Sequence, residues 1–168
     1  MISKYFLDNI LFRSIWSTRI IAFFLGSTSI FSFSPFDLYF LPFFLLLPLL
    51  YSFYILSPLQ SAWVGFSYGL GLFLSGTYWL YVSIHIFGKT SLALAIFLMF
   101  SLILIMSLYY GLTGWLISKV SRKRILAFLL AAPSIWTLFE WLRGWLLTGF
   151  PWMSLGYSQI DSVLSGFG

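Results

Sequence analysis

Residues 139–152 read FEWLRGWLLTGFPW and close a hydrophobic run that begins at Ile125. Glu140 and Arg143 are the two charged residues in this stretch, and they lie among tryptophans. An ionisable side chain in lipid costs at least about 2.5 kcal/mol, so such residues are usually paired and usually functional. Because positions three apart share one helix face, we expect Glu140 and Arg143 to form an ion pair. The pair would either clamp the outer end of a membrane helix or take part in chemistry.

Composition extends the membrane pattern to the whole chain. Of its 168 residues, 61% are hydrophobic and 8% are charged. A soluble domain is roughly 45–50% apolar and about 25% charged, so this chain could not cover a water-exposed surface with polar groups. We therefore predict an all-α protein, a multi-pass membrane helix bundle.

Five hydrophobic segments predict about five transmembrane helices inside a bundle that covers residues 20–147. The spans are expected near residues 20–34, 38–56, 61–84, 91–118 and 125–144. The first would be short, about 22 Å at 1.5 Å per residue. Asp37 is expected to cap the N-terminus of the second span, and Ser61 that of the third.

The lysines and arginines predict the orientation. Seven of the nine lie in residues 1–19, expected to be a cytoplasmic N-terminus, or in the loop 119–124. Lys89 and Arg143 fall on the opposite side, together with a periplasmic or interfacial segment at residues 148–168. This bias places the N-terminus in the cytoplasm. The net charge of +5 is thus explained by the predicted membrane topology. No nucleic-acid partner is expected, because no nucleic-acid-binding motif accompanies the charge.

An alternative makes residues 1–26 a cleaved signal peptide. The basic start fits this interpretation, but no Ala-x-Ala site follows, and the next hydrophobic run begins almost at once. The sequence therefore favours a retained first span.

Small residues in the third predicted span indicate close helix packing. Gly65, Gly69 and Gly76 share one helical face, and Gly71 lies on nearly the opposite face between Ser67 and Ser75. Small residues four apart let helix backbones approach closely in lipid. We expect this helix to pack on both sides, near the centre of the bundle.

The residues that could carry chemistry are few: Asp37, His85, Glu140, Arg143 and Asp161. They form no nucleophile, base and orienting group at recognisable spacing. The chain has no cysteine, which excludes a disulfide, a zinc–thiolate site and a cysteine nucleophile within it. No catalytic residue, metal ligand or cofactor site is predicted from the residues alone.

Three blocks of sequence resemble the bacterial apolipoprotein N-acyltransferase family. They are residues 33–37 (FSPFD), residues 65–88 with GTYWLYVSIHIFG at 76–88, and residues 139–152 followed by GYSQ at 156–159. The third block is the most specific. Together they cover most of the chain in the order found in the family.

The resemblance implies a membrane enzyme of the bacterial inner membrane. Such enzymes move an acyl chain from a phospholipid to the N-terminal amino group of a diacylglyceryl-cysteine lipoprotein. The implied partners are the phospholipid acyl donor and the diacylated apolipoprotein. Catalysis in the family belongs to a nitrilase-like domain with a Glu-Lys-Cys triad, which forms a thioester intermediate.

This sequence departs from the family pattern because it has no residue that matches the Glu, Lys or Cys. We expect the N-terminal membrane part of such an enzyme, inactive alone, with the nitrilase-like domain missing in cis or supplied in trans. It would be a fragment, a truncated reading frame or half of a split protein. The alternative is a non-catalytic lipid-binding or assembly bundle, or the product of a decayed gene. The substrate-facing, lipid-facing or structural candidates are Glu140, Arg143, Trp145, Trp152 and His85, with Arg143 a candidate partner for a lipid phosphate.

Overall fold

The computed structural model describes residues 14–146 and 149–167, and these residues form helices, turns and loops without a β-strand. The predicted all-α class is confirmed. Lys4 and Arg13, which contribute to the predicted cytoplasmic N-terminus, lie outside the described residues, as do positions 147–148.

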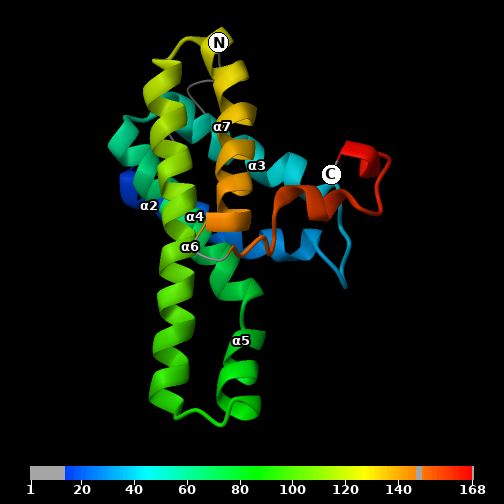
Figure 1. The fold of residues 1–168 in the computed structure, drawn as a ribbon. Helices are drawn as coiled ribbons and strands as arrows, with labels where there is room; N and C mark the ends of the chain where they lie inside the picture. The colour runs from blue at the N-terminus through cyan, green and yellow to red at the C-terminus, as the bar shows by residue number, and fades with distance from the viewer. Residues whose placement is uncertain (1–13, 147–148, 168) are drawn as a thin grey trace.

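Within residues 14–146 and 149–167, five long helices and several short ones follow in order. They are α2 (Ile15–Thr28) with the 3₁₀ turn η1 (Ser29–Ser32), α3 (Leu41–Ile55), α4 (Pro58–Gly76), α5 (Trp79–Tyr81) with the π-helical turn η2 (Val82–Phe87), α6 (Leu92–Ser121), α7 (Ile125–Trp145), and the 3₁₀ turns η4 (Leu155–Gln159) and η5 (Ser165–Phe167). Figure 1 shows α6 running the full height of the molecule, with α7 beside its C-terminal half and α5 beside its N-terminal half.

Three segments within the described residues are long and apolar enough to cross a membrane: Ile15–Ser32, Leu92–Ser121 and Ile125–Trp145. Pro58–Gly76 and Trp79–Phe87 make a fourth if this pair, bent by 54°, is one span. Helix α3 is apolar but shorter, with 15 residues. These elements agree with a bundle of about five membrane helices.

The first helix begins earlier than the sequence predicted. Ser14 caps α2, and its Oγ accepts a hydrogen bond of 3.1 Å from the backbone N–H of Ser17. With η1 the helical segment is 18 residues long, so it is not the short span expected at residues 20–34. Arg19, which the sequence prediction assigns to the N-terminal segment 1–19, therefore lies on the helix.

Two predicted helix caps are wrong. Asp37 lies in the loop before α3 with a φ of 53°, and α3 begins only at Leu41, without a side-chain cap. Ser57, not Ser61, caps α4, in a capping box with Gln60. Pro58 at the first position of this helix fixes φ and explains why the helix begins there. Ser61 is instead a buried residue inside α4.

The third predicted span, residues 61–84, is not one continuous helix. Helix α4 ends at Gly76, and the chain bends by 54° before α5. Thr77 ends the helix with its backbone outside the helical region, and its hydroxyl donates to the carbonyl of Phe73 at 2.6 Å. The residues after this break are also mostly apolar, so the hydrophobic pattern of the sequence could not reveal where the helix ends.

Helix α4 lies between α2 and α6, which are its two most extensive partners. A Cβ on Gly65 would overlap the carbonyl of Tyr110, and one on Gly69 would lie 2.8 Å from the Cα of Ser107, both on α6. A Cβ on Gly71 would overlap the carbonyl of Phe23 on α2. Gly76 differs, because it lies against the Met153 side chain. Glycine at positions 65, 69 and 71 lets the backbones touch.

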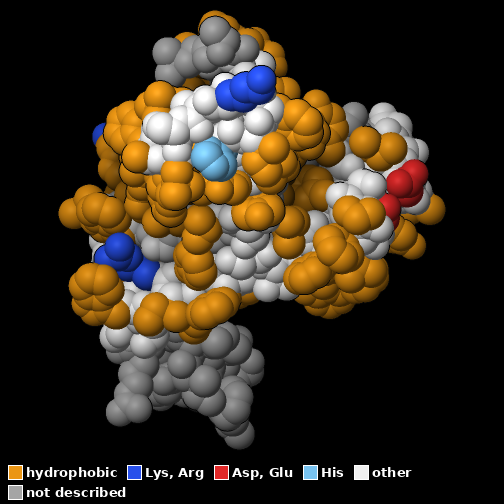
Figure 2. Space-filling model, turned by 90° about the horizontal axis from the view of Figure 1, so that it is seen from below, with side chains coloured by type: hydrophobic (Ala, Val, Ile, Leu, Met, Phe, Trp, Pro, Cys, Tyr) orange, Lys and Arg blue, Asp and Glu red, His pale blue; other side chains and the backbone are white. Residues whose placement is uncertain are grey.

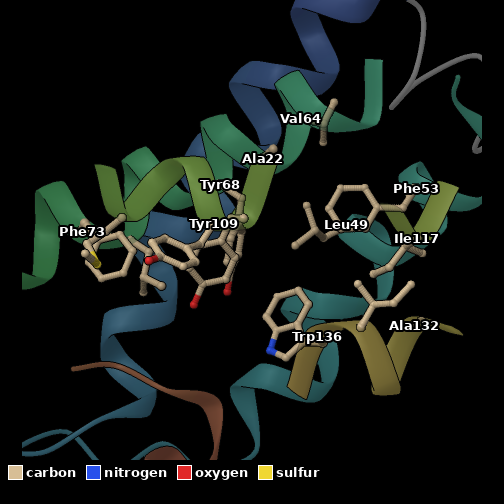
Figure 3. Close-up of a cluster of buried hydrophobic side chains, with 14 of the residues drawn as sticks. Ala22, Leu49, Phe53, Val64, Tyr68, Phe73, Tyr109, Ile117, Ala132 and Trp136 are labelled. Atoms are coloured by element: carbon tan, nitrogen blue, oxygen red, sulfur yellow. The ribbon is translucent and has the colours of Figure 1, made fainter. Parts of the chain in front are cut away.

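Most of the buried hydrophobic side chains among the described residues form one cluster between the helices. Figure 3 shows Ala22, Val64, Tyr68, Ile117 and Trp136 among its members, which come from α2, α4, α6 and α7. The surface is also apolar: Figure 2 shows hydrophobic side chains over most of the described face seen from below, with few charges. Lipid is the environment that suits such a surface.

Candidate functional site

The chain turns back on itself at the C-terminal end of α7, in the third sequence block. The helix ends at Trp145, and the chain returns through Gly149, whose φ is 77°. A Cβ there would overlap the carbonyl of Gly144, so only glycine fits. The backbone N–H of Phe150 then donates to the carbonyl of Arg143 at 2.8 Å. This turn starts a segment, residues 149–167, that we call the return segment.

Arg143 holds the return segment against the bundle. Its side chain is 1% exposed, and Nη1 donates to the backbone carbonyl of Phe150 at 3.0 Å and to that of Trp152. Nη2 donates to the hydroxyl of Ser154 at 2.9 Å. Planar guanidinium donors suit several acceptors at fixed angles, which explains why arginine and not lysine serves here.

Aromatic rings enclose the same guanidinium from the bundle side. Its carbon lies 5.4 Å from the ring centroid of Phe73 and 6.0 Å from that of Tyr110. Cation–π attraction offsets part of the cost of removing the charge from water. Because these rings come from α4 and α6, Arg143 joins three helices and the return segment.

Glu140 holds the next part of the return segment. Its Oε1 accepts a hydrogen bond of 2.9 Å from the backbone N–H of Leu155 and lies 4.0 Å from Nη2 of Arg143. The two charges therefore lie together, as their spacing suggested, but their shorter bonds go to the return segment. Since Arg143 is almost fully buried, its donors do not reach the surface where a lipid phosphate would lie.

A groove of about 700 Å³ lies between α7 and the return segment, and we call it the outer groove after the side of the membrane that the sequence predicts for it. Its lining includes Glu140, Trp141, Gly144 and Trp145 from α7, and Leu155 and Tyr157 from the return segment. The lining is mainly apolar and aromatic, with the Glu140 carboxylate as its charged group. Such a volume suits an apolar ligand oriented by a few polar contacts.

The other candidates lie around this groove or apart from it. Trp145 lines the groove, whereas Trp152 is half exposed and packs 5.5 Å from the Trp79 ring. His85 lies in η2, where Nδ1 is 2.7 Å from the carbonyl of Thr90. His85 is not among the described residues that line the outer groove.

Within the described residues, no three His, Cys, Asp or Glu side chains are grouped so that they could hold a metal ion. Asp37 and Asp161 are exposed, and neither lines the outer groove. The hydrogen bonds of Glu140 and Arg143 fix the backbone of the return segment, and Glu140 also lines the outer groove.

Comparison with known proteins bears directly on this region. A sequence model described as "Apolipoprotein N-acyltransferase N-terminal domain" matches residues 25–167, a range that contains α7 and the return segment. The chain belongs to the apolipoprotein N-acyltransferase family.

Curated relatives agree with this assignment. An apolipoprotein N-acyltransferase of Vibrio parahaemolyticus is 40% identical over 162 residues, which are 95% of this chain and 32% of that protein. One of Pseudomonas putida is 36% identical over 90% of this chain and 30% of that protein. One of Coxiella burnetii is 44% identical over 66% of this chain and 23% of that protein. The chain thus spans between about a quarter and a third of the length of these relatives.

The three blocks that resemble the apolipoprotein N-acyltransferases meet at the return segment. Met153 packs on Gly76 and Trp152 on Trp79, both in the second block. Phe33, in the first block, lines a small gap together with Met153 and Leu155. The blocks are therefore parts of one structural unit at the C-terminal end of α7.

Several residues of this unit were missed by sequence reasoning. Ser154 and Leu155 bind Arg143 and Glu140, and Gln159 donates to the carbonyl of Tyr39 at 2.9 Å. Ser154 and Leu155 carry no distinctive spacing, and much of their role falls to backbone atoms. Gln159 could have been identified from the sequence, since it lies in the GYSQ sequence that follows the third block.

Proposed function

We propose that this chain is the membrane part of an apolipoprotein N-acyltransferase in the bacterial inner membrane. It would hold the phospholipid acyl donor and the diacylated apolipoprotein near the outer leaflet. The nitrilase-like region that carries the Glu-Lys-Cys triad would act on them, in cis or in trans. The chain has no cysteine, so we propose that it transfers no acyl group alone.

The outer groove is the observation that supports this function. It opens between α7 and the return segment, and its volume of about 700 Å³ is large enough for part of an acyl chain. Trp141 and Trp145 on its wall are half exposed or more, as expected for aromatic residues at a membrane interface. An acyl chain lying there would place its ester bond near the end of the bundle.

Arg143 and Glu140 would act as positioning residues. They fix the return segment, which forms one wall of the groove, through bonds to Phe150, Ser154 and Leu155. Small displacements of a bound substrate cost large factors in rate, so a loosened wall would slow transfer without any change in the catalytic groups.

A first experiment measures acyl transfer by the chain alone. The purified 168-residue protein is mixed with phospholipid and a diacylated lipopeptide, and the product is read by mass spectrometry. We expect no triacylated lipopeptide above a protein-free control. Product formation by the chain alone would overturn this part of the proposal.

A second experiment supplies the nitrilase-like region. The chain is fused to the remainder of the Vibrio parahaemolyticus relative, and acyl transfer is measured in the fusion. Gly144→Leu would fill the groove, where a Cβ meets nothing nearer than Pro151 at 4.0 Å, and should slow transfer about tenfold or more. Gly166→Leu is the matched control, because a Cβ there has open space. If the unmodified fusion folds but transfers nothing, the non-catalytic alternative gains; if Gly144→Leu is fully active, the groove is not the acyl site.

A third experiment tests the proposed orientation. Arg122→Cys in the loop between α6 and α7, and Lys89→Cys at the opposite end of α6, introduce single thiols into a chain without cysteine. With a cytoplasmic N-terminus, a membrane-impermeant maleimide should label position 89 in cells with a permeabilised outer membrane, and position 122 only after lysis. The reverse pattern would invert the topology.

A further inference from the structure

A second groove lies between α4 and α6, at the end of the bundle opposite the return segment. Its volume is about 410 Å³, and its described lining is wholly hydrophobic apart from a glycine. Trp63 and Phe66 form the α4 wall, Leu108, Leu112 and Trp115 form the α6 wall, and Gly111 lies between these walls. We call it the inner groove.

Two cationic side chains contact the tryptophan rings of the inner groove. The guanidinium carbon of Arg19, on α2, lies 5.0 Å from the Trp63 ring centroid, and Nζ of Lys119 lies 4.3 Å from that of Trp115. Within the described residues, the structure records no carboxylate in an ion pair with either cation. Each positive charge is held at the groove by the face of a tryptophan ring. The N–H groups of Arg19 and Lys119 can therefore bind an anion.

We propose that the inner groove binds one anionic phospholipid from the leaflet next to the basic 119–124 loop. The acyl chain would lie between Trp63 and Trp115, and the phosphate would lie toward Arg19 and Lys119. This proposal is independent of acyl transfer at the outer groove. Its test therefore does not depend on whether the proposed function is correct.

The charge distribution favours an anionic lipid over other occupants. A zwitterionic lipid would bring its own cation toward Arg19 and Lys119, and a transmembrane helix of a partner would need a carboxylate at this depth to match them. An anionic phospholipid supplies the negative charge and the apolar chain in one molecule. Basic residues at the membrane surface are known to attract such lipids.

The first test is competition between two lipids. The 168-residue protein in detergent is mixed with equal amounts of dioleoyl phosphatidylglycerol and dioleoyl phosphatidylcholine, and bound lipids are counted by native mass spectrometry. We expect one phosphatidylglycerol to bind preferentially. Lys119→Gln should lower this preference about fivefold, and the double variant Arg19→Gln with Lys119→Gln should lower it further. Equal binding of both lipids to the unmodified protein would overturn the proposal.

A matched control separates the site from net charge. Arg122→Gln with Lys123→Gln removes the same charge from the loop after α6, and neither residue lines the groove. The preference should fall clearly less than in the Arg19 and Lys119 variants, since these loop residues do not touch the groove and exposed charges are screened by salt. If this control loses as much preference as the Arg19 and Lys119 variants, diffuse attraction explains the binding and the proposal fails.

Groove-filling variants test the position of the acyl chain. Ala62→Leu adds volume at the groove and keeps both cations, and Leu112→Trp does so from a wall side chain that is half exposed. Each folded variant should lose the bound phosphatidylglycerol. Retention in both, or displacement of the lipid by millimolar inorganic phosphate, would show that the site binds only an anion.

Discussion

The two halves of α6 have the same helical form but different surroundings. From Met106 to Ser121 the helix lies inside the bundle, and ten of its residues are buried. From Leu92 to Ile105 it runs beside α5 and η2, away from the other long helices, and only Ala95 and Ile103 are buried. At 1.5 Å per residue the whole helix is about 45 Å long, longer than a bilayer core of about 30 Å.

The difference follows from small residues and not from hydrophobicity. The C-terminal half carries Ser107, Gly111, Gly114 and Ser118 at helical spacing on one face, and α4 approaches along that face. The N-terminal half is as apolar, but bulky leucine, isoleucine and phenylalanine side chains cover it. Because lipid tails are as apolar as leucine, apolar surface alone does not bring helices together in a membrane. The spacing of small residues decides which half is packed.

The largest expected effect comes from filling the contact between α4 and the packed half. Gly65→Leu would drive a side chain into the backbone of Tyr110, and Gly69→Leu would do the same at Ser107. Overpacking costs about 1–3 kcal/mol where neighbours can shift, and more where the obstacle is backbone. We expect both variants to aggregate or to lose a cooperative thermal transition in detergent, as read by circular dichroism and size exclusion.

Gly166→Leu serves as the control, because a Cβ at that position meets nothing within 4 Å. It should melt like the parent. If Gly65→Leu and Gly69→Leu also melt like the parent, the close approach of α4 and α6 is wrong.

An intermediate effect is expected at Arg143, which joins the packed half of α6 to the return segment. Arg143→Ala leaves the carbonyls of Phe150 and Trp152 without their donor and the Glu140 carboxylate without its neighbouring cation. Breaking a buried charged group's network in this way costs about 3–5 kcal/mol. The return segment should then be cut by protease at least tenfold faster in micelles, while the helices stay protected.

Arg143→Lys and Lys89→Ala refine this result. Lysine keeps the charge but lacks the guanidinium fork, so it should restore only part of the protection. Lys89 is exposed in the loop before α6, and its loss should leave the cleavage rate unchanged. Rapid cleavage of the parent itself would mean that Arg143 does not fix the segment in solution.

Much of the bundle could be predicted from the sequence because its signals are local and periodic. Hydropathy indicates about five helices, and the spacing of Gly65, Gly69 and Gly71 indicates two packed faces on α4. The structure places Gly65 and Gly69 against α6, and Gly71 against α2. The Ser57 capping box was also visible, since serine followed three residues later by glutamine is a known helix-start pattern.

The site was less predictable because backbone atoms make much of it. Arg143 and Glu140 stand out as charges in an apolar run, but two acceptors of Arg143 are carbonyls, and the donor to Glu140 is an amide. Every residue carries those groups, so no sequence pattern marks them. The outer groove depends on where the return segment lies in space, and the break at Thr77 falls inside a continuous apolar run.

The smallest effect is expected in the exposed half of α6, and one matched pair of substitutions measures it. Phe97 is 65% exposed within the chain, whereas Phe73 is fully buried beside Arg143 and Tyr110. Because most of the Phe97 side chain contacts no protein, Phe97→Ala should change the free energy of unfolding by less than about 0.5 kcal/mol. Phe73→Ala leaves a cavity and should cost about 3–5 kcal/mol. Reversible unfolding with sodium dodecyl sulfate in mixed micelles measures both, and equal losses would mean that the N-terminal half of α6 is packed against protein in solution.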